Sequence, residues 1–105
     1  LVEDFQADWI LVSAGFDAHR EDPLTDMGLT SGDFADLTLN LFNLAPKNRC
    51  IFFLEGGYNL QALTDSVTAS FASIMGINSR PESATGDGPG VEVVTRVAKS
   101  HGVIL

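Results

Sequence analysis

Cysteine is almost absent from this chain of 105 residues, in which Cys50 is the only thiol. A single cysteine cannot form a disulfide within the chain, so a small disulfide-stabilised fold is excluded. Cys50 begins an apolar run, residues 50–54, in which a thiol usually behaves as a small buried hydrophobic group. This cysteine usage fits a reducing compartment, and we expect a cytoplasmic location.

Basic residues are scarce, and long hydrophobic segments are missing. Six Lys and Arg residues stand against 14 Asp and Glu residues, which gives a formal net charge of -8. Direct binding to nucleic acid is not expected, because an acidic protein repels the phosphate backbone. No apolar stretch approaches the roughly 20 residues that cross a bilayer, and residues 1–14 lack the basic start of a secretory signal. Membrane insertion is therefore not expected either.

Two short apolar runs, residues 9–14 and residues 50–54, each reach glycine within two residues. Such uninterrupted runs predict parallel strands that are buried on both faces. Between them, residues 30–33 (Thr-Ser-Gly-Asp) are typical of a capped helix start, and Pro46 ends that helix. The apolar residues at helical spacing are Phe34, Leu37, Leu41 and Leu44.

A second helix is predicted to begin just after Asn59 and to stop at Gly76. Its apolar residues are Leu60, Leu63, Val67, Phe71 and Ile74. Residues 78–90 are rich in Gly, Pro and polar residues, which predicts a loop or linker after a main portion of residues 1–77. Residues 91–105 are predicted to form a terminal helix and tail, because their apolar residues share one helical face.

The order of strand, helix, strand and helix indicates an α/β fold built on a parallel sheet. Two strands do not make a stable sheet with helices on both faces, so we expect the chain to be incomplete as a domain. The missing strands are expected from the remainder of the domain or from a second copy of the chain. The start at Leu1, without an initiator methionine, suggests a piece of a longer protein.

Polar motifs follow both predicted strands, where ligands bind in α/β sheets. After the first strand, Asp17, His19 and Asp22 are possible ligands of a cation. The alternative is a polar loop in which Asp22 begins a turn. After the second strand, residues 56–58 (Gly-Gly-Tyr) form either a tight turn in which the tyrosine packs, or a close backbone approach to a ligand with a phenol that donates to an oxyanion.

Both motifs resemble those of the histone deacetylase family. Residues 13–19 (Ser-Ala-Gly-Phe-Asp-Ala-His) and 22–24 (Asp-Pro-Leu) are similar to a late motif of the family, and residues 54–59 (Leu-Glu-Gly-Gly-Tyr-Asn) match a second one in the same order. The likeness is to class II enzymes, acetoin utilisation proteins and acetylpolyamine amidohydrolases, and it covers roughly residues 5–76. It implies part of an arginase-like parallel α/β sheet with flanking helices, here its C-terminal portion.

The resemblance also implies a site. The family holds Zn²⁺ with two aspartates and one histidine, and Asp17 matches one of the aspartates. Tyr58 matches the tyrosine whose hydroxyl donates to the acetyl carbonyl. The glycines Gly56 and Gly57 would line the narrow channel for the substrate chain, and Leu24 resembles an apolar wall residue of that channel.

The remaining ligands and the histidine pair that activates water lie upstream of the matched stretch, so the chain alone is expected to be inactive. The implied activity of the intact protein is hydrolysis of an N-acetyl amide, such as acetyl-lysine, an acetylated polyamine or a small acetyl amide, by zinc-activated water. His19 matches no ligand, and a place beside the zinc loop or at its rim is left open.

Two alternatives stay open. The chain could be a non-catalytic, deacetylase-like interaction module, or belong to another α/β hydrolase or metal-dependent enzyme of the arginase superfamily. Four acidic residues outside the motifs are expected to be solvated charges: Asp4, Asp8, Glu82 and Asp87.

Overall fold

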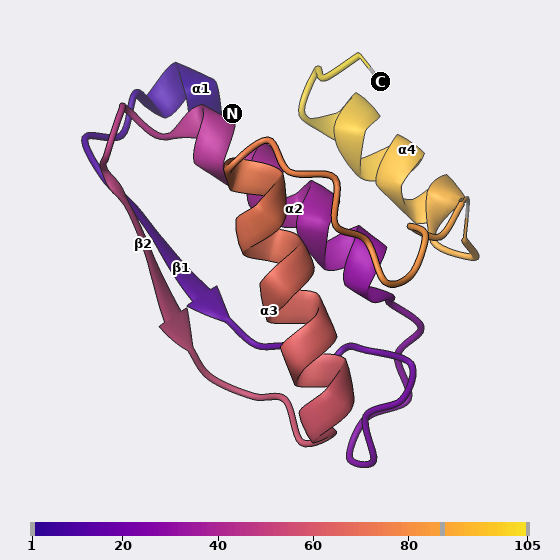
Figure 1. The fold of residues 1–105 in the computed structure, drawn as a ribbon. Helices are drawn as coiled ribbons and strands as arrows, with labels where there is room; N and C mark the ends of the chain where they lie inside the picture. The colour runs from indigo at the N-terminus through magenta and orange to yellow at the C-terminus, as the bar shows by residue number, and fades with distance from the viewer. Residues whose placement is uncertain (1, 87, 105) are drawn as a thin grey trace.

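A computed structural model describes residues 2–86 and 88–104 (Figure 1). Its elements are α1 (Val2–Phe5), β1 (Ile10–Ala14), α2 (Ser31–Leu44), β2 (Cys50–Leu54), α3 (Leu60–Ile74) and α4 (Val91–Ser100). The predicted order of strands and helices is confirmed, and the one addition is α1, a single helical turn before β1.

The two strands pair in parallel, with Ile10 opposite Cys50 and Ala14 opposite Leu54. A parallel pair needs a long crossover connection, which α2 and its flanking loops supply. Because the strands run in the same direction, the segments that leave them start at the same edge of the sheet (Figure 1). The motifs after β1 and β2 are therefore neighbours.

Both long helices begin at the caps that their sequences favour. The Thr30 side chain accepts a hydrogen bond from the backbone of Asp33, and the Asp33 carboxylate accepts one from the backbone of Thr30, which closes a capping box at the start of α2. At the start of α3, the Asn59 side chain accepts from the amides of Gln61 and Ala62. Tyr58 thus lies directly before a fixed helix start.

Helices α2 and α3 pack against each other and cover one face of the sheet (Figure 1). Small side chains allow this close packing, since Ala35 of α2 and Ala69 of α3 are fully buried. The Ser73 hydroxyl of α3 donates to the backbone oxygen of Ala35 across the contact. At the sheet edge, the rings of Phe16 and Phe34 meet with centroids 5.0 Å apart, so the loop after β1 is anchored in the core.

The opposite face of the sheet is bare. Leu11, Ile51 and Phe53 point away from the helices and are 63%, 39% and 52% exposed. The prediction that the strands are buried on both faces is wrong for this chain, because α2 and α3 lie on one side only and no described segment covers the other. The apolar pattern of the strands predicts that both faces of the sheet are covered, and in this chain α2 and α3 cover one of them.

Residues 78–86 form neither helix nor strand, but they are not a free linker. They pack on the start of α2, where the Thr30 hydroxyl donates to the Ser83 carbonyl over 2.7 Å and the Thr85 amide donates to Asp33 over 2.8 Å. A side chain at Gly32 would come within 2.3 Å of the Ala84 nitrogen, so only glycine permits this approach.

Glu82 lies in this packed segment, and the expectation that it is a solvated charge is wrong. Its side chain is 22% exposed and bonds to two other segments. Asp87, for which the same was expected, lies outside the described residues.

Helix α4 has no buried residue and lies beyond α2, on the side away from the sheet (Figure 1). Among the described residues, no helix is both long enough and apolar enough to cross a membrane. The boundaries at 77/78 and 90/91 between main portion, loop and tail stay predictions.

Candidate active site

The Asp17 carboxylate lies against Gly56, across the edge where both strands end. The Phe16 amide donates to the Gly56 carbonyl over 2.8 Å, which joins the two segments beyond the strands. A Cβ atom built on Gly56 would come within 2.6 Å of Asp17 Cγ, and one built on Gly15 within 2.8 Å of Asp17 Oδ1. The carboxylate therefore occupies a notch that exists because both neighbours lack side chains.

No described residue forms a hydrogen bond or ion pair with the Asp17 carboxylate, which is partly exposed, although the Thr25 hydroxyl donates to the backbone oxygen of Asp17. A carboxylate oxygen in an open notch suits Zn²⁺, which accepts Asp ligands. Within the described part of the chain, no group of three or more His, Cys, Asp or Glu residues could hold a metal ion. Among the described residues, the Asp17 carboxylate is suited to serve as one ligand, and no three such groups lie together.

Asp22 connects the loop after β1 to the turn after β2. Its Oδ1 accepts from the Leu24 amide and its Oδ2 from the Tyr58 amide, both over 2.8 Å. Burial alone would raise the pKa of Asp22, but the amides of Tyr58, Leu24, Thr25 and Asn59 outweigh it and lower the pKa. Both oxygens are thus engaged by backbone amides, as in the turn alternative for this residue.

The Asp22 carboxylate accepts from the backbone amides of Tyr58 and Leu24, and the side chains of these two residues extend outward. Their side chains are 55% and 69% exposed. A further bond, from Asn59 Nδ2 to the Glu21 carbonyl over 3.0 Å, ties the same two loops together. The structure thus brings Leu24, Tyr58 and the Asp17 notch to one edge of the sheet.

Gly57 has a role in the turn itself. Its φ of +136° favours glycine, and a Cβ there would come within 3.1 Å of the Leu63 side chain and 3.2 Å of Phe16 Cβ. This geometry turns the chain from β2 into α3 and sets the place of Tyr58. The predicted part of Gly56 and Gly57 in a substrate channel stays a prediction.

His19 is buried and both of its ring nitrogens are engaged. Nδ1 accepts from the Glu21 amide over 3.1 Å, so Nε2 carries the hydrogen and donates to Glu82 Oε2 over 2.8 Å. Its ring stacks on Phe34, with centroids 6.5 Å apart. Among the possibilities for His19, the structure favours a place behind the Asp17 loop over direct metal ligation.

Glu82 is the residue that the sequence interpretation missed. The Ser31 amide, the His19 ring and the Arg20 guanidinium lower its pKa to about 2 against the opposing effect of burial. Its partners His19 and Ser31 lie more than 50 residues away in the sequence, so no local pattern marks the contact. The sequence showed only that Glu82 lies in a segment rich in Gly, Pro and polar residues.

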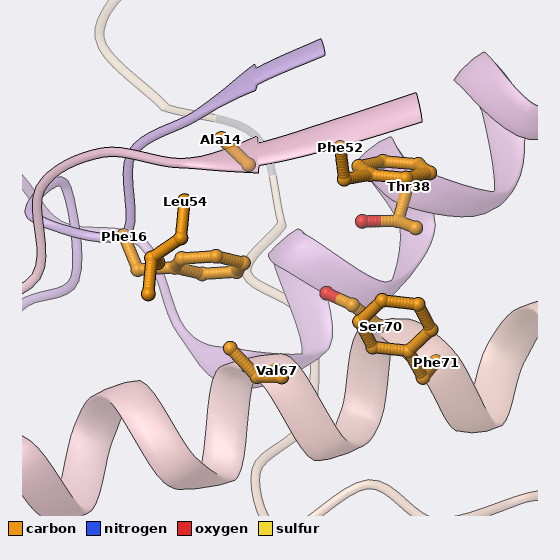
Figure 2. A pocket seen from close by; sticks show the side chains of 8 residues that line it. All are labelled: Ala14, Phe16, Thr38, Phe52, Leu54, Val67, Ser70 and Phe71. Carbon is orange, nitrogen blue, oxygen red and sulfur yellow. The ribbon is translucent and has the colours of Figure 1, made fainter. Parts of the chain in front are cut away.

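A cavity of about 240 Å³ separates the covered face of the sheet from α3 (Figure 2). The residues that line it are Ala14, Phe16, Thr38, Phe52, Leu54, Val67, Ser70 and Phe71. No titratable side chain lines it, and the only polar side chains among the lining residues are the hydroxyls of Thr38 and Ser70. It is an apolar gap in the core below the sheet edge, not a place for acid or metal chemistry.

Residues 1–74 match the histone deacetylase domain. Histone deacetylase 14, chloroplastic, of Arabidopsis thaliana is 46% identical over 78 residues, which cover 71% of this chain and 18% of that protein. The polyamine deacetylase HDAC10 of Danio rerio is 41% identical over 73 residues, which cover 70% of this chain and 11% of that protein.

The solved structure of the histone deacetylase Clr3 superposes with a TM-score of 0.76 and 34% identity, over 91% of this chain and 16% of that chain. This chain therefore spans less than a fifth of the length of each of these three proteins.

Proposed function

The chain belongs to the histone deacetylase family, and from this membership we propose that it supplies one zinc ligand and one oxyanion donor to a zinc-dependent deacetylase. The prediction that the chain is part of an arginase/deacetylase-like sheet with flanking helices is confirmed by the structural likeness to Clr3. Membership supports deacetylase hydrolysis in general. The metal, the mechanism and the substrate are the proposal.

The observation that carries the proposal is the notch at the sheet edge. Asp17, after β1, faces Gly56, after β2, and Tyr58 follows Gly56 by two residues on a turn that Asp22 fixes. A metal ligand and a hydrogen-bond donor for an oxyanion must lie within a few ångströms of one reacting carbonyl. The parallel pairing of β1 and β2 is what places their motifs at one edge.

In this mechanism each residue has one task. Asp17 would hold Zn²⁺, which when bound polarises the acetyl carbonyl and lowers the pKa of a water molecule. The Tyr58 hydroxyl donates a hydrogen bond to the acetyl oxygen as negative charge develops there. Gly56 and Gly57 leave room for the substrate chain, and Leu24 gives it an apolar wall.

The substrate is an N-acetyl amide: acetyl-lysine, an acetylated polyamine or a small acetyl amide. The remaining ligands would come from the remainder of the domain, which also supplies the missing strands, and the chain alone is inactive. We call the protein that joins all these parts the complete domain. The cytoplasmic location and the lack of nucleic-acid and membrane partners stay predictions, and the Arabidopsis relative is named as chloroplastic.

The proposal is tested by changing Tyr58 to Phe in the complete domain. The variant keeps the ring and removes only the hydroxyl. Because one oxyanion donor is lost, we expect kcat to fall by about 100-fold to 1,000-fold. Zinc content, measured by elemental analysis, stays unchanged, whereas Asp17→Asn lowers it. Turnover of an acetyl-lysine substrate that is unaffected by Tyr58→Phe would exclude this role for Tyr58.

A non-catalytic interaction module is the second candidate. It is favoured by the bare apolar face of the sheet and because the described residues include no group of three or more His, Cys, Asp or Glu that could hold a metal ion. A complete domain that binds no zinc and hydrolyses no acetyl amide would favour this candidate over the first.

A further inference from the structure

The carboxylate of Glu82 joins three segments of the chain. Its Oε2 accepts from His19 Nε2 over 2.8 Å and from the Ser31 amide over 3.0 Å, and its Oε1 accepts from the Arg20 guanidinium. The Glu82 amide in turn donates to the Ser31 hydroxyl over 3.2 Å. Glu82 thus connects the segment after α3 to the first turn of α2 and to the loop that carries Asp17.

The surroundings make this contact stable. Ser31 is fully buried and His19 is 3% exposed, so the bonds on Oε2 are shielded from water. Ser31 is the first residue of α2, where backbone N–H groups lack partners within the helix and favour a negative charge. The same contacts lower the pKa of Glu82, so they favour the ionised carboxylate over the protonated acid.

Besides Glu82, the loop around Asp17 is held by the packing of Phe16 on Phe34 and by the Thr25 hydroxyl, which donates to the Asp17 backbone oxygen. Ala18 and Arg20 form backbone hydrogen bonds with Leu29, over 3.1 Å and 2.8 Å. Leu29 lies in the same connection between β1 and α2, so these bonds do not tie the loop to another part of the fold. On the far side Asp22 holds the turn of Tyr58. Glu82 adds a contact from the segment after α3, which reaches the Asp17 loop through His19 and Arg20.

We propose that Glu82 is a positioning residue for Asp17: through His19 it holds the loop so that the Asp17 carboxylate stays in the notch between Gly15 and Gly56. This inference rests on the proposed role of Asp17 as a zinc ligand. A ligand held in place binds metal more tightly, because less conformational freedom is lost on binding. The segment after α3 is thereby part of the support of the metal site.

A purely structural role for Glu82, as a cap of α2, predicts a different result. Loss of a cap lowers the free energy of unfolding but leaves the zinc affinity of the folded protein unchanged. Arg80 offers a matched control, because its guanidinium bonds to Asp36 from the same segment without touching the Asp17 loop. Removal of either side chain loosens the segment from α2, and only removal of Glu82 frees His19.

The experiment compares Glu82→Ala, Glu82→Gln and Arg80→Ala in the complete domain. The zinc dissociation constant is measured by competition with a chelator on samples that thermal scans show to be folded, and hydrogen exchange is followed in peptides that cover residues 15–25. We expect Glu82→Ala to weaken zinc binding about tenfold and to speed exchange in the loop. Glu82→Gln keeps one acceptor, so its zinc affinity is expected to lie between those of Glu82→Ala and the unchanged protein. Arg80→Ala is expected to bind zinc as tightly as the unchanged protein.

Zinc affinity that is unchanged in Glu82→Ala, or reduced as strongly in Arg80→Ala, would overturn the inference. Asp17→Asn separates this failure from that of the proposed function. If Asp17→Asn loses zinc while Glu82→Ala keeps it, only the role of Glu82 falls. If Asp17→Asn keeps zinc, the metal site is misplaced and both fall.

Discussion

At the scale of single residues, two adjacent glycines serve the site by different means. Gly57 adopts a positive φ that a side chain disfavours, whereas Gly56 gives up the space that the Asp17 carboxylate fills. The sequence interpretation assigned both to the substrate channel by resemblance. The contact between Gly56 and Asp17 could not be predicted from local pattern, because it depends on the register of β1 and β2.

Gly56→Ala is therefore expected to disturb the proposed metal site directly. The new Cβ would come within 2.6 Å of Asp17 Cγ, so the carboxylate must leave the notch. We expect the complete domain to bind zinc at least about tenfold more weakly. Elemental analysis after dialysis measures the loss.

Gly28→Ala is the matched control, since a Cβ at Gly28 meets nothing within 4 Å. It should retain zinc as the unchanged protein does. Full zinc content in Gly56→Ala would mean that Asp17 does not depend on this notch.

At the scale of elements, the features that the sequence predicted are those encoded within a few residues. The capping box of Thr30 and Asp33, the Asn59 cap and the glycine that ends α3 all lie next to the helices they limit. The docking of Glu82 on α2 joins residues that are 51 positions apart, and no periodicity marks such a contact. The tertiary fold alone makes this glutamate a half-buried contact between segments.

The docking of Glu82 on α2 should make the free energy of unfolding depend on pH in the acidic range. The pKa of Glu82 falls from 4.5 to about 2 on folding, so its contribution is complete above pH 4.5 and is lost as the pH falls toward 2. Once solvent screening is allowed for, the contribution is on the order of 2 kcal/mol. Glu82→Gln should thus be less stable than the unchanged complete domain at pH 7, and the difference should shrink toward pH 2.

Urea unfolding of both proteins across this pH range measures the difference. The exposed Glu92 of α4 gives the control, and Glu92→Gln should match the unchanged protein at each pH. A Glu82→Gln deficit that is the same at pH 7 and pH 2 would show that the carboxylate charge does not stabilise the contact.

At the scale of the whole molecule, the chain forms a sheet with helices on only one of its two faces. The apolar strands predicted two buried faces, and the chain covers one, which leaves Leu11, Ile51 and Phe53 exposed. In the complete domain this face should be buried by the remaining segments. In the isolated chain it is open to self-association, because exposed apolar patches drive contact between copies.

Phe53→Lys should therefore have opposite effects in the two settings. In the isolated chain it removes an exposed apolar ring, so sedimentation should show less self-association. In the complete domain it places a charge in a covered layer, which should lower the free energy of unfolding by several kcal/mol. Val93→Lys is the control, because Val93 is 49% exposed against 52% for Phe53 but lies in α4. Equal stability of the two variants in the complete domain would mean that the outer face of the sheet stays open there, and that the fold closes by some other surface.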